Sequence, residues 1–127
     1  MFKTNPYNAY KQNSVNMSSK EQLLLMLVDG AVKYTKIAKM AISERDMARA
    51  HKELIRVQDI FTELMITLDK SAGKWAEDLY KVYDYIRYEL GRANIRKDIT
   101  IIDKVLPLIE DVRDTWHEAD NLRKQGK

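Results

Sequence analysis

The sequence contains no cysteine, and only four glycines and two prolines are spread over its 127 residues. Without cysteine the chain forms no disulfide and offers no thiolate to a metal ion. Glycine and proline are the residues that most often interrupt helices and strands. Because both are scarce, we expect the few that occur to mark the boundaries between long regular elements.

Long apolar runs and a strong charge of one sign are also lacking. The longest apolar run, Leu23 to Val28, is far shorter than the roughly 20 residues that a membrane-spanning helix needs. The N-terminus lacks the charged-then-apolar pattern of a secretory signal. Lys and Arg number 22 against 19 for Asp and Glu, and the two signs are interspersed. We therefore expect a cytoplasmic protein without membrane insertion or nucleic-acid binding.

The remaining composition is that of one globular domain. Apolar residues make up 45% of the chain, which is too high for a disordered protein. A chain of this length fits one domain and buries roughly two-thirds of its unfolded surface. Residues 1–17 differ from the rest, since they are polar and turn-prone and contain Asn5-Pro6. We predict an irregular N-terminal arm over 1–17, a helical bundle over 18–123 and a basic tail over 124–127.

Capping residues divide the bundle into four helices. Ser18 and Glu21 have the spacing of a capping box, which places the first helix start at Ser18. Asp46 is a suitable N-cap for the second helix, which should end in the segment that leads to Gly73. Asp98 can cap the fourth helix.

Each predicted helix carries an apolar stripe with spacings of three and four residues. The stripes are Leu23, Leu27, Gly30, Tyr34, Ile37 and Ala41; Met47, Ala50, Leu54, Val57, Phe61, Leu64 and Leu68; Leu79, Val82, Ile86, Leu90 and Ala93; and Ile102, Val105, Ile109, Val112, Trp116 and Ala119. Short connections between long helices favour antiparallel neighbours. The predicted fold is therefore all-α, an antiparallel up-down four-helix bundle with an irregular N-terminal arm. Its core should include Leu54, Phe61, Leu64, Ile86 and Trp116.

Pro107 lies inside the fourth predicted helix. Its ring removes the hydrogen bond to the carbonyl of Asp103 and crowds the preceding turn. A kink in a continuous helix and a true break are both compatible with this residue.

The sequence offers little to an enzyme. The two histidines, His51 and His117, lie on different predicted helices, and the nearest match to the Glu-x-x-His motif of a di-iron bundle is a single Asp114-x-x-His117 without a second copy. We expect His117 to be solvated or loosely packed. The glycines are isolated, so no phosphate-binding loop is present. We predict no catalytic residue, no metal site and no cofactor.

A nucleic-acid-binding bundle would gather its cations on one face. Lys33, Lys36 and Lys39 follow the first helix, but the second and third helices carry many carboxylates. This alternative is therefore disfavoured.

A second set of apolar residues faces away from the predicted core stripes. On the first helix these are Leu25, Val28 and Val32; on the second, Ile55 and Ile66; on the third, Tyr88 and Ile95, with Tyr80 and Tyr85 beside the stripe. An extended apolar surface usually marks a binding site. It could be covered by Tyr7 and Tyr10 of the arm, by a second copy of the chain, or by an amphipathic segment of another protein.

Several segments resemble the FliS-type flagellar secretion chaperones. They are Asn5-Pro6-Tyr7-Asn8-Ala9-Tyr10-Lys11-Gln12-Asn13-Ser14-Val15, Glu21-Gln22-Leu23-Leu24-Leu25-Met26-Leu27-Val28-Asp29-Gly30, Gln58-Asp59-Ile60, Tyr83-Asp84-Tyr85-Ile86, Ala93-Asn94 and Trp116. The resemblance extends over nearly the whole chain. One departure is Val28, where that family usually has Tyr.

The resemblance implies a function in export. A protein of this family binds the C-terminal region of flagellin in the cytoplasm, prevents premature polymerisation and docks at the cytoplasmic domain of the flagellar export gate. It also implies that the N-terminal arm covers part of the binding groove and gives way to the client. Combined with helical-face geometry, the candidate partner-binding residues are Tyr7, Tyr10, Leu25, Val28, Ile55, Ile66, Tyr80, Tyr85 and Tyr88. The alternative is a helical protein-interaction or homodimeric structural module that does not bind flagellin.

Overall fold

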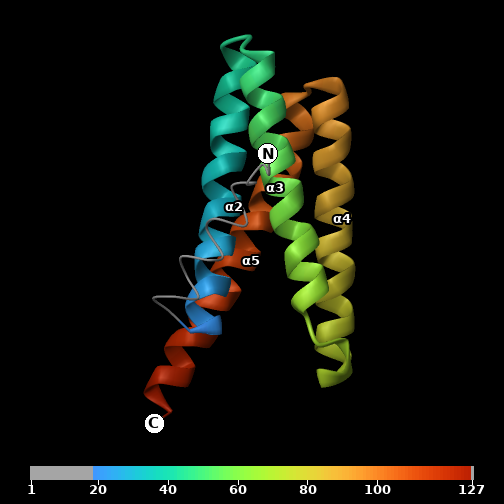
Figure 1. The fold of residues 1–127 in the computed structure, drawn as a ribbon. Helices are drawn as coiled ribbons and strands as arrows, with labels where there is room; N and C mark the ends of the chain where they lie inside the picture. Colours follow the sequence, from blue (N-terminus) through green and yellow to red (C-terminus); the bar gives the residue numbers. More distant parts are fainter. Residues whose placement is uncertain (1–18, 127) are drawn as a thin grey trace, which may run out of the picture.

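The computed structural model describes residues 19–126, which form four α-helices and one 3₁₀ turn. They are α2 (Lys20–Ser43), α3 (Met47–Thr67), η1 (Lys70–Ala72), α4 (Lys74–Arg96) and α5 (Ile99–Gln125). Successive helices run in opposite directions (Figure 1). Helices α2 and α4 each pack against both α3 and α5. The predicted all-α antiparallel four-helix bundle is confirmed.

The predicted arm over 1–17 lies outside the described residues. At the other end of the chain, α5 continues through Lys124 and Gln125, beyond the predicted bundle boundary at residue 123.

Two of the predicted helix caps are present, and one is shifted. Asp46 accepts a hydrogen bond from the Arg49 N–H at 3.2 Å, and Asp98 accepts one from the Thr100 N–H at 2.9 Å. The N-cap of α2 is Ser19, whose Oγ accepts from the Gln22 N–H at 3.3 Å. The prediction of Ser18 was wrong by one residue, because two consecutive serines each have Glu or Gln three positions later.

The core contains most of the residues that the apolar stripes predicted. Leu54, Phe61, Leu64 and Ile86 are all fully buried, whereas Trp116 is half-buried. Together with their neighbours, these side chains form one continuous cluster that involves all four long helices.

The rotation of α4 differs from the prediction. Val82, predicted in the core, is 38% exposed, and Tyr83 is buried in its place with 1% exposure. Tyr83 packs edge-to-face on Phe61 with 5.8 Å between ring centroids, and the Trp116 Nε1–H donates to the Tyr83 hydroxyl at 2.9 Å. A large ring with a satisfied hydroxyl fills the space between α3, α4 and α5 better than valine, which explains the difference.

The prediction that Val28 and Val32 face outward was wrong. Val28 is 1% exposed and Val32 is also buried, while Leu25 is half-buried. Helix α2 contacts α3 on one side and α5 on the other. It therefore needs an apolar surface wider than a single stripe, and both valines contribute to that surface.

Helix α5 is continuous through Pro107, so the predicted alternative of a true break was wrong. Proline removes one backbone hydrogen bond. Ile102, Val105, Ile109 and Val112 are buried on both sides of it, and their burial holds the two halves in one helix.

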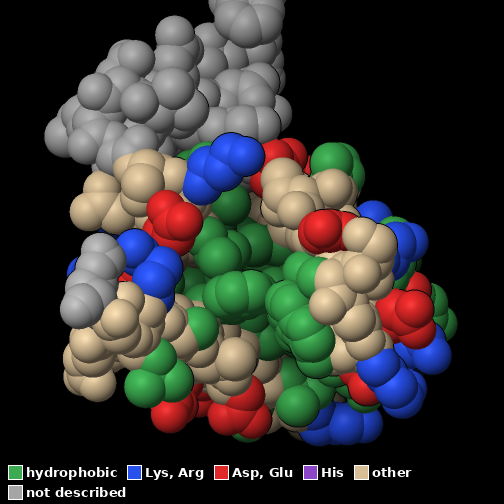
Figure 2. Space-filling model, turned by 90° about the horizontal axis from the view of Figure 1, so that it is seen from below, with side chains coloured by type: hydrophobic (Ala, Val, Ile, Leu, Met, Phe, Trp, Pro, Cys, Tyr) green, Lys and Arg blue, Asp and Glu red, His purple; other side chains and the backbone are tan. Residues whose placement is uncertain are grey.

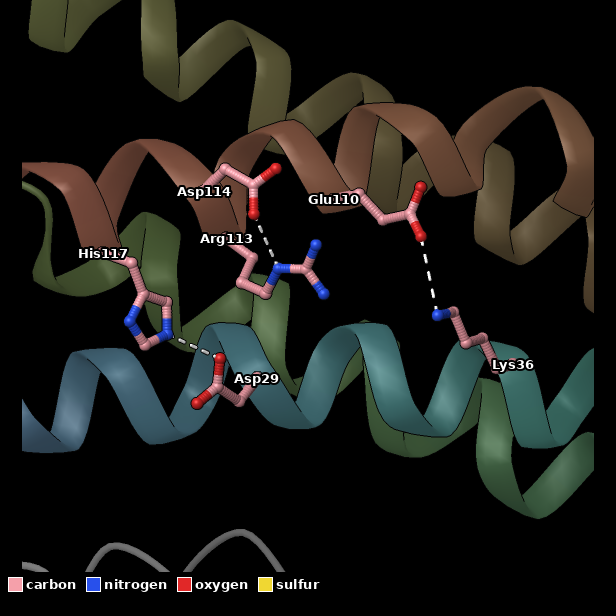
Figure 3. A network of polar contacts seen from close by, with 6 residues as sticks. All are labelled: Asp29, Lys36, Glu110, Arg113, Asp114 and His117. Carbon is pink, nitrogen blue, oxygen red and sulfur yellow. Dashed lines mark hydrogen bonds and ion pairs between the residues drawn. The ribbon is translucent and has the colours of Figure 1, made fainter.

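Polar pairs connect α2 and α5 along their exposed edge (Figure 3). His117 Nε2 lies 2.7 Å from Asp29 Oδ1, and Lys36 Nζ lies 3.6 Å from Glu110 Oε2. His117, expected to be solvated or loosely packed, is thus partly exposed but hydrogen-bonded to the neighbouring helix. Because the groups are exposed, each pair stabilises the fold by only about 0–1 kcal/mol.

We predict that Tyr83→Phe destabilises the protein at neutral pH but not in alkali. Loss of the hydrogen bond with Trp116 should lower the free energy of unfolding by about 1 kcal/mol at pH 7. Burial raises the pKa of Tyr83 from 10.0 to about 12, against the weaker opposing effect of the Trp116 hydrogen bond. The unfolded chain therefore loses this proton first. The contribution of Tyr83 to stability is intact below pH 10 and declines as the pH rises towards 12.

Urea unfolding of the wild type and Tyr83→Phe between pH 7 and pH 11.5 measures this effect. The stability difference between them should shrink above pH 10 and then reverse. A difference that stays constant over the whole range would contradict the buried, hydrogen-bonded tyrosine.

A second prediction distinguishes the buried valine from the exposed isoleucine. Val28→Asp should abolish cooperative folding, since it places a carboxylate without a partner in the core. Ile66→Asp should change the free energy of unfolding by no more than about 0.5 kcal/mol, since Ile66 is 72% exposed. Circular dichroism with thermal unfolding measures both. Equal destabilisation by the two substitutions would refute this assignment of faces.

Candidate protein-binding groove

Chemical sites are not evident in the described part of the chain. Within residues 19–126 no three His, Cys, Asp or Glu side chains are grouped so that they could hold a metal ion. His51 Nδ1 and the Asn94 side-chain amide lie 3.0 Å apart, which occupies this histidine in a contact between α3 and α4. None of the helices in the same range is long and apolar enough to cross a membrane.

An open groove of about 1150 Å³ lies between α3 and α4. It is lined by Ile55, Gln58, Asp59, Thr62, Tyr80, Lys81, Asp84, Tyr85, Arg87, Tyr88, Gly91, Arg92 and Ile95. All of these residues belong to two antiparallel helices that are adjacent in sequence. The groove is therefore built by one helical hairpin.

Both helices present a second, outward-facing line of residues along the groove. On α3 the spacing of Ile55, Asp59 and Thr62 is four and three, and on α4 Tyr88, Gly91 and Ile95 are three and four apart. Such spacing keeps residues on one face of a helix over several turns. Two parallel lines of this kind form a trough into which a third helix can pack its own side chains.

The apolar residues of the groove are unusually exposed. Ile55 is 40% exposed, Tyr88 is 65% exposed and Ile95 is 86% exposed, although all three are large. A cluster of exposed apolar side chains in one surface hollow usually marks an interaction site, whereas single scattered ones do not.

Charged groups of both signs surround the apolar strip. Arg87 forms a salt bridge with Asp84 at 3.1 Å and approaches the Thr62 hydroxyl at 3.4 Å, so its position is fixed across the two helices. Arg92 pairs with Glu89 at 2.7 Å. Asp59 has no hydrogen-bond or ion-pair partner among residues 19–126, and partial burial raises the pKa of its carboxyl group above the ordinary value.

The candidate residues from the sequence fall into five groups. Ile55, Tyr80, Tyr85 and Tyr88 line the groove. Ile66 is exposed on α3 but outside the lining, Leu25 is half-buried elsewhere, and Val28 is in the core. Tyr7 and Tyr10 lie outside the described residues. The structure therefore brings four of the nine residues together.

Sequence reasoning missed the polar and small residues of the groove. The binding residues predicted from the sequence are all apolar or aromatic, so they do not include Gln58, Asp59, Thr62 and Gly91. The signal that could have found them is the three-and-four spacing itself, which continues from Ile55 to Thr62 and from Tyr88 to Ile95 regardless of polarity.

A second apolar surface lies at the end of the bundle where α2 begins and α5 ends. There the two helix pairs diverge (Figure 1), and apolar side chains fill the centre of that end (Figure 2). Trp75 and Trp116 meet edge-to-face at 6.5 Å beside a pocket of about 210 Å³. Leu25 lines a separate pocket of about 120 Å³ against Trp116. Both pockets are much smaller than the groove and fit single side chains.

The groove suits the binding of a helical segment. Its α4 wall extends from Tyr80 to Ile95, which corresponds to about 22 Å of helix length. An amphipathic helix of that length can place one apolar face on the exposed residues and leave the other in water.

Comparisons with known proteins agree with a binding role. The family model described as flagellar protein FliS matches residues 3–123. The chain is 38% identical over 123 residues to the flagellar secretion chaperone FliS of Bacillus subtilis strain 168, which covers 97% of this chain and 92% of that protein. It is 31% identical over 116 residues to the flagellar secretion chaperone FliS of Campylobacter jejuni subsp. jejuni, with 91% of each covered.

A solved structure supports the same assignment at the level of the fold. The bundle is similar to a crystal structure of a flagellar chaperone from bacteria with a TM-score of 0.73 and 16% sequence identity, over 91% of this chain and 94% of that one. The family model and the two relatives extend over nearly the whole chain, and they confirm the resemblance found in the sequence. The chain belongs to the FliS family of flagellar secretion chaperones.

Proposed function

We propose that the protein is a cytoplasmic export chaperone that binds the C-terminal segment of flagellin in the groove between α3 and α4. Membership of a chaperone family implies a non-enzymatic role and a secreted protein as partner. The observation that carries the proposal is the pair of outward-facing lines on α3 and α4, with Ile55, Tyr88 and Ile95 exposed on them. The sequence resemblance supports flagellin as the secreted protein.

Burial of apolar area provides the mechanism. A segment that polymerises through an apolar stripe loses that ability while the stripe is covered by the chaperone. Each Å² of apolar surface buried contributes about 25 cal/mol. Ordering a segment that is disordered when free costs about 2–5 kcal/mol, which keeps the complex releasable at the export apparatus.

The other faces of the bundle fit this partner less well. The exposed edge between α2 and α5 is occupied by ion pairs such as Lys36–Glu110 and Lys39–Asp103. Lys36 and Lys39 of α2 are thereby paired with carboxylates, which also disfavours a phosphate-binding face. The pockets beside Trp116 take single side chains and cannot seat a helix.

Two further parts of the proposal come from the resemblance. The N-terminal arm, with Tyr7 and Tyr10, covers part of the groove until flagellin displaces it. The complex then docks at the cytoplasmic domain of the flagellar export gate. In this proposal the groove is partly covered by the arm in the free chaperone and by flagellin in the loaded one.

Isothermal titration calorimetry with a peptide from the C-terminal region of flagellin tests this function. We expect one-to-one binding with a negative heat-capacity change, because apolar surface is buried. A groove variant, Ile55→Asp/Tyr88→Asp, should bind at least tenfold more weakly and remain folded, since both side chains are exposed.

A matched control carries the same two charges away from the groove. Met40→Asp/Leu122→Asp replaces two exposed apolar residues, on α2 and α5, and should bind the peptide like the wild type. If both variants bind equally well, the site is elsewhere. If the wild type does not bind the peptide and sedimentation shows a dimer that the groove variant dissolves, the homodimeric alternative is correct.

A further inference from the structure

Two glycines lie in the interior of helices, and their surroundings differ. Gly30 is buried on α2, and a Cβ atom there would lie 3.3 Å from Tyr34 Cε2 and 3.5 Å from Ile60 Cδ1. A Cβ atom would thus crowd the ring of Tyr34, one turn later on the same helix, which accounts for Gly30.

Packing does not account for Gly91 on α4. A Cβ atom there would meet only Gln58 Oε1, the end of a flexible side chain, at an ordinary contact distance of 3.4 Å. The backbone does not need glycine either, since Gly73 is the one glycine with positive φ among residues 19–126. Glycine in a helix interior is less stable than alanine. The fold would thus gain stability from a side chain at position 91.

The location of Gly91 in the groove explains why the absence of a side chain matters there. It lines the groove, and it lies on the same face of α4 as Tyr88 and Ile95, three residues before and four residues after it. Gln58 faces it from α3. Two large exposed side chains thus stand on either side of a position with none, which leaves a notch in the floor of the groove.

Asp59 adds a charge beside this notch. It follows Gln58 on α3, lines the groove, and has neither a hydrogen bond nor an ion pair within residues 19–126. Two arginines of the groove are already paired, Arg87 with Asp84 and Arg92 with Glu89. Asp59 is therefore available to a cation from outside the chain.

We propose that Gly91 and Asp59 determine the specificity of the groove: the notch at Gly91 receives one large apolar side chain of the bound helix, and Asp59 pairs with a Lys or Arg of that helix. This inference rests on the proposed function, because the bound helix is a segment of the secreted cargo. It adds that the cargo helix carries a Leu, Ile, Met or Phe with a basic residue within about one turn of it.

Substitutions at position 91 separate this role from a structural one. Gly91→Ala should raise the melting temperature and weaken binding of the flagellin C-terminal peptide a few-fold. Gly91→Leu should fill the notch and weaken binding at least tenfold without a loss in melting temperature. Thr115→Leu is the control, since it adds the same side chain at an exposed position on α5, away from the groove. It should leave the affinity unchanged.

Asp59→Asn tests the charge. It should weaken binding several-fold and make the affinity less dependent on salt, because one ion pair is removed.

If the wild type binds the peptide and Gly91→Leu binds equally well, the notch is refuted while the proposed function stands. Unchanged affinity and salt dependence in Asp59→Asn would likewise refute the ion pair. If Gly91→Leu fails to fold, Gly91→Ala decides, since tighter or equal binding by a stabilised variant overturns the inference. A wild type that does not bind the peptide overturns both this inference and the proposed function.

Discussion

The burial of Tyr83 fixes the rotation of α4, and the groove depends on that rotation. The ring packs edge-to-face on Phe61 of α3, and its hydroxyl accepts the indole N–H of Trp116 on α5. One side chain thus connects three helices, with both its apolar body and its polar end satisfied. Once Tyr83 points inward, the helical repeat places Tyr85, Tyr88 and Ile95 on the outside. A rotation by one residue would have buried Val82 and turned a different set of residues towards α3.

Helices α3 and α4 contribute to the core on one side and to the proposed groove on the other. On α3 the inward residues from Leu54 to Leu64 are fully buried, whereas Ile55 on the opposite side is exposed. Two antiparallel helices of a four-helix bundle leave an outer trough between them, and in the proposed function the apolar residues on both rims contact a third helix. The edge between α2 and α5 carries ion pairs instead.

Much of the fold could be predicted because helix periodicity and capping are local properties. Asp46 and Asp98 act on backbone N–H groups two or three residues away, so their roles are visible in the sequence. The wrong predictions concern residues whose burial depends on contacts with other helices, which are distant in sequence. Val28 was predicted to face outward because one stripe was taken as the whole core face of its helix, but α2 contacts two helices and buries a wider surface. Similarly, Val82 and Tyr83 are adjacent, and only the shape of the space between α3 and α5 selects the tyrosine.

The sequence by itself determined the helical class, the helix starts capped by Asp46 and Asp98, most of the central core residues and, through its resemblance, the family. Those features depend on which residue types occur at which spacing along the chain, and this can be read directly from the sequence. The tertiary structure decided which apolar residues form a surface, since exposure depends on how many neighbours each helix has. It also decided the surroundings of the two interior glycines: a Cβ atom at Gly30 would crowd the ring of Tyr34, whereas Gly91 borders the groove. That difference depends on how side chains pack and on the groove between two helices, neither of which the pattern of a single helix contains.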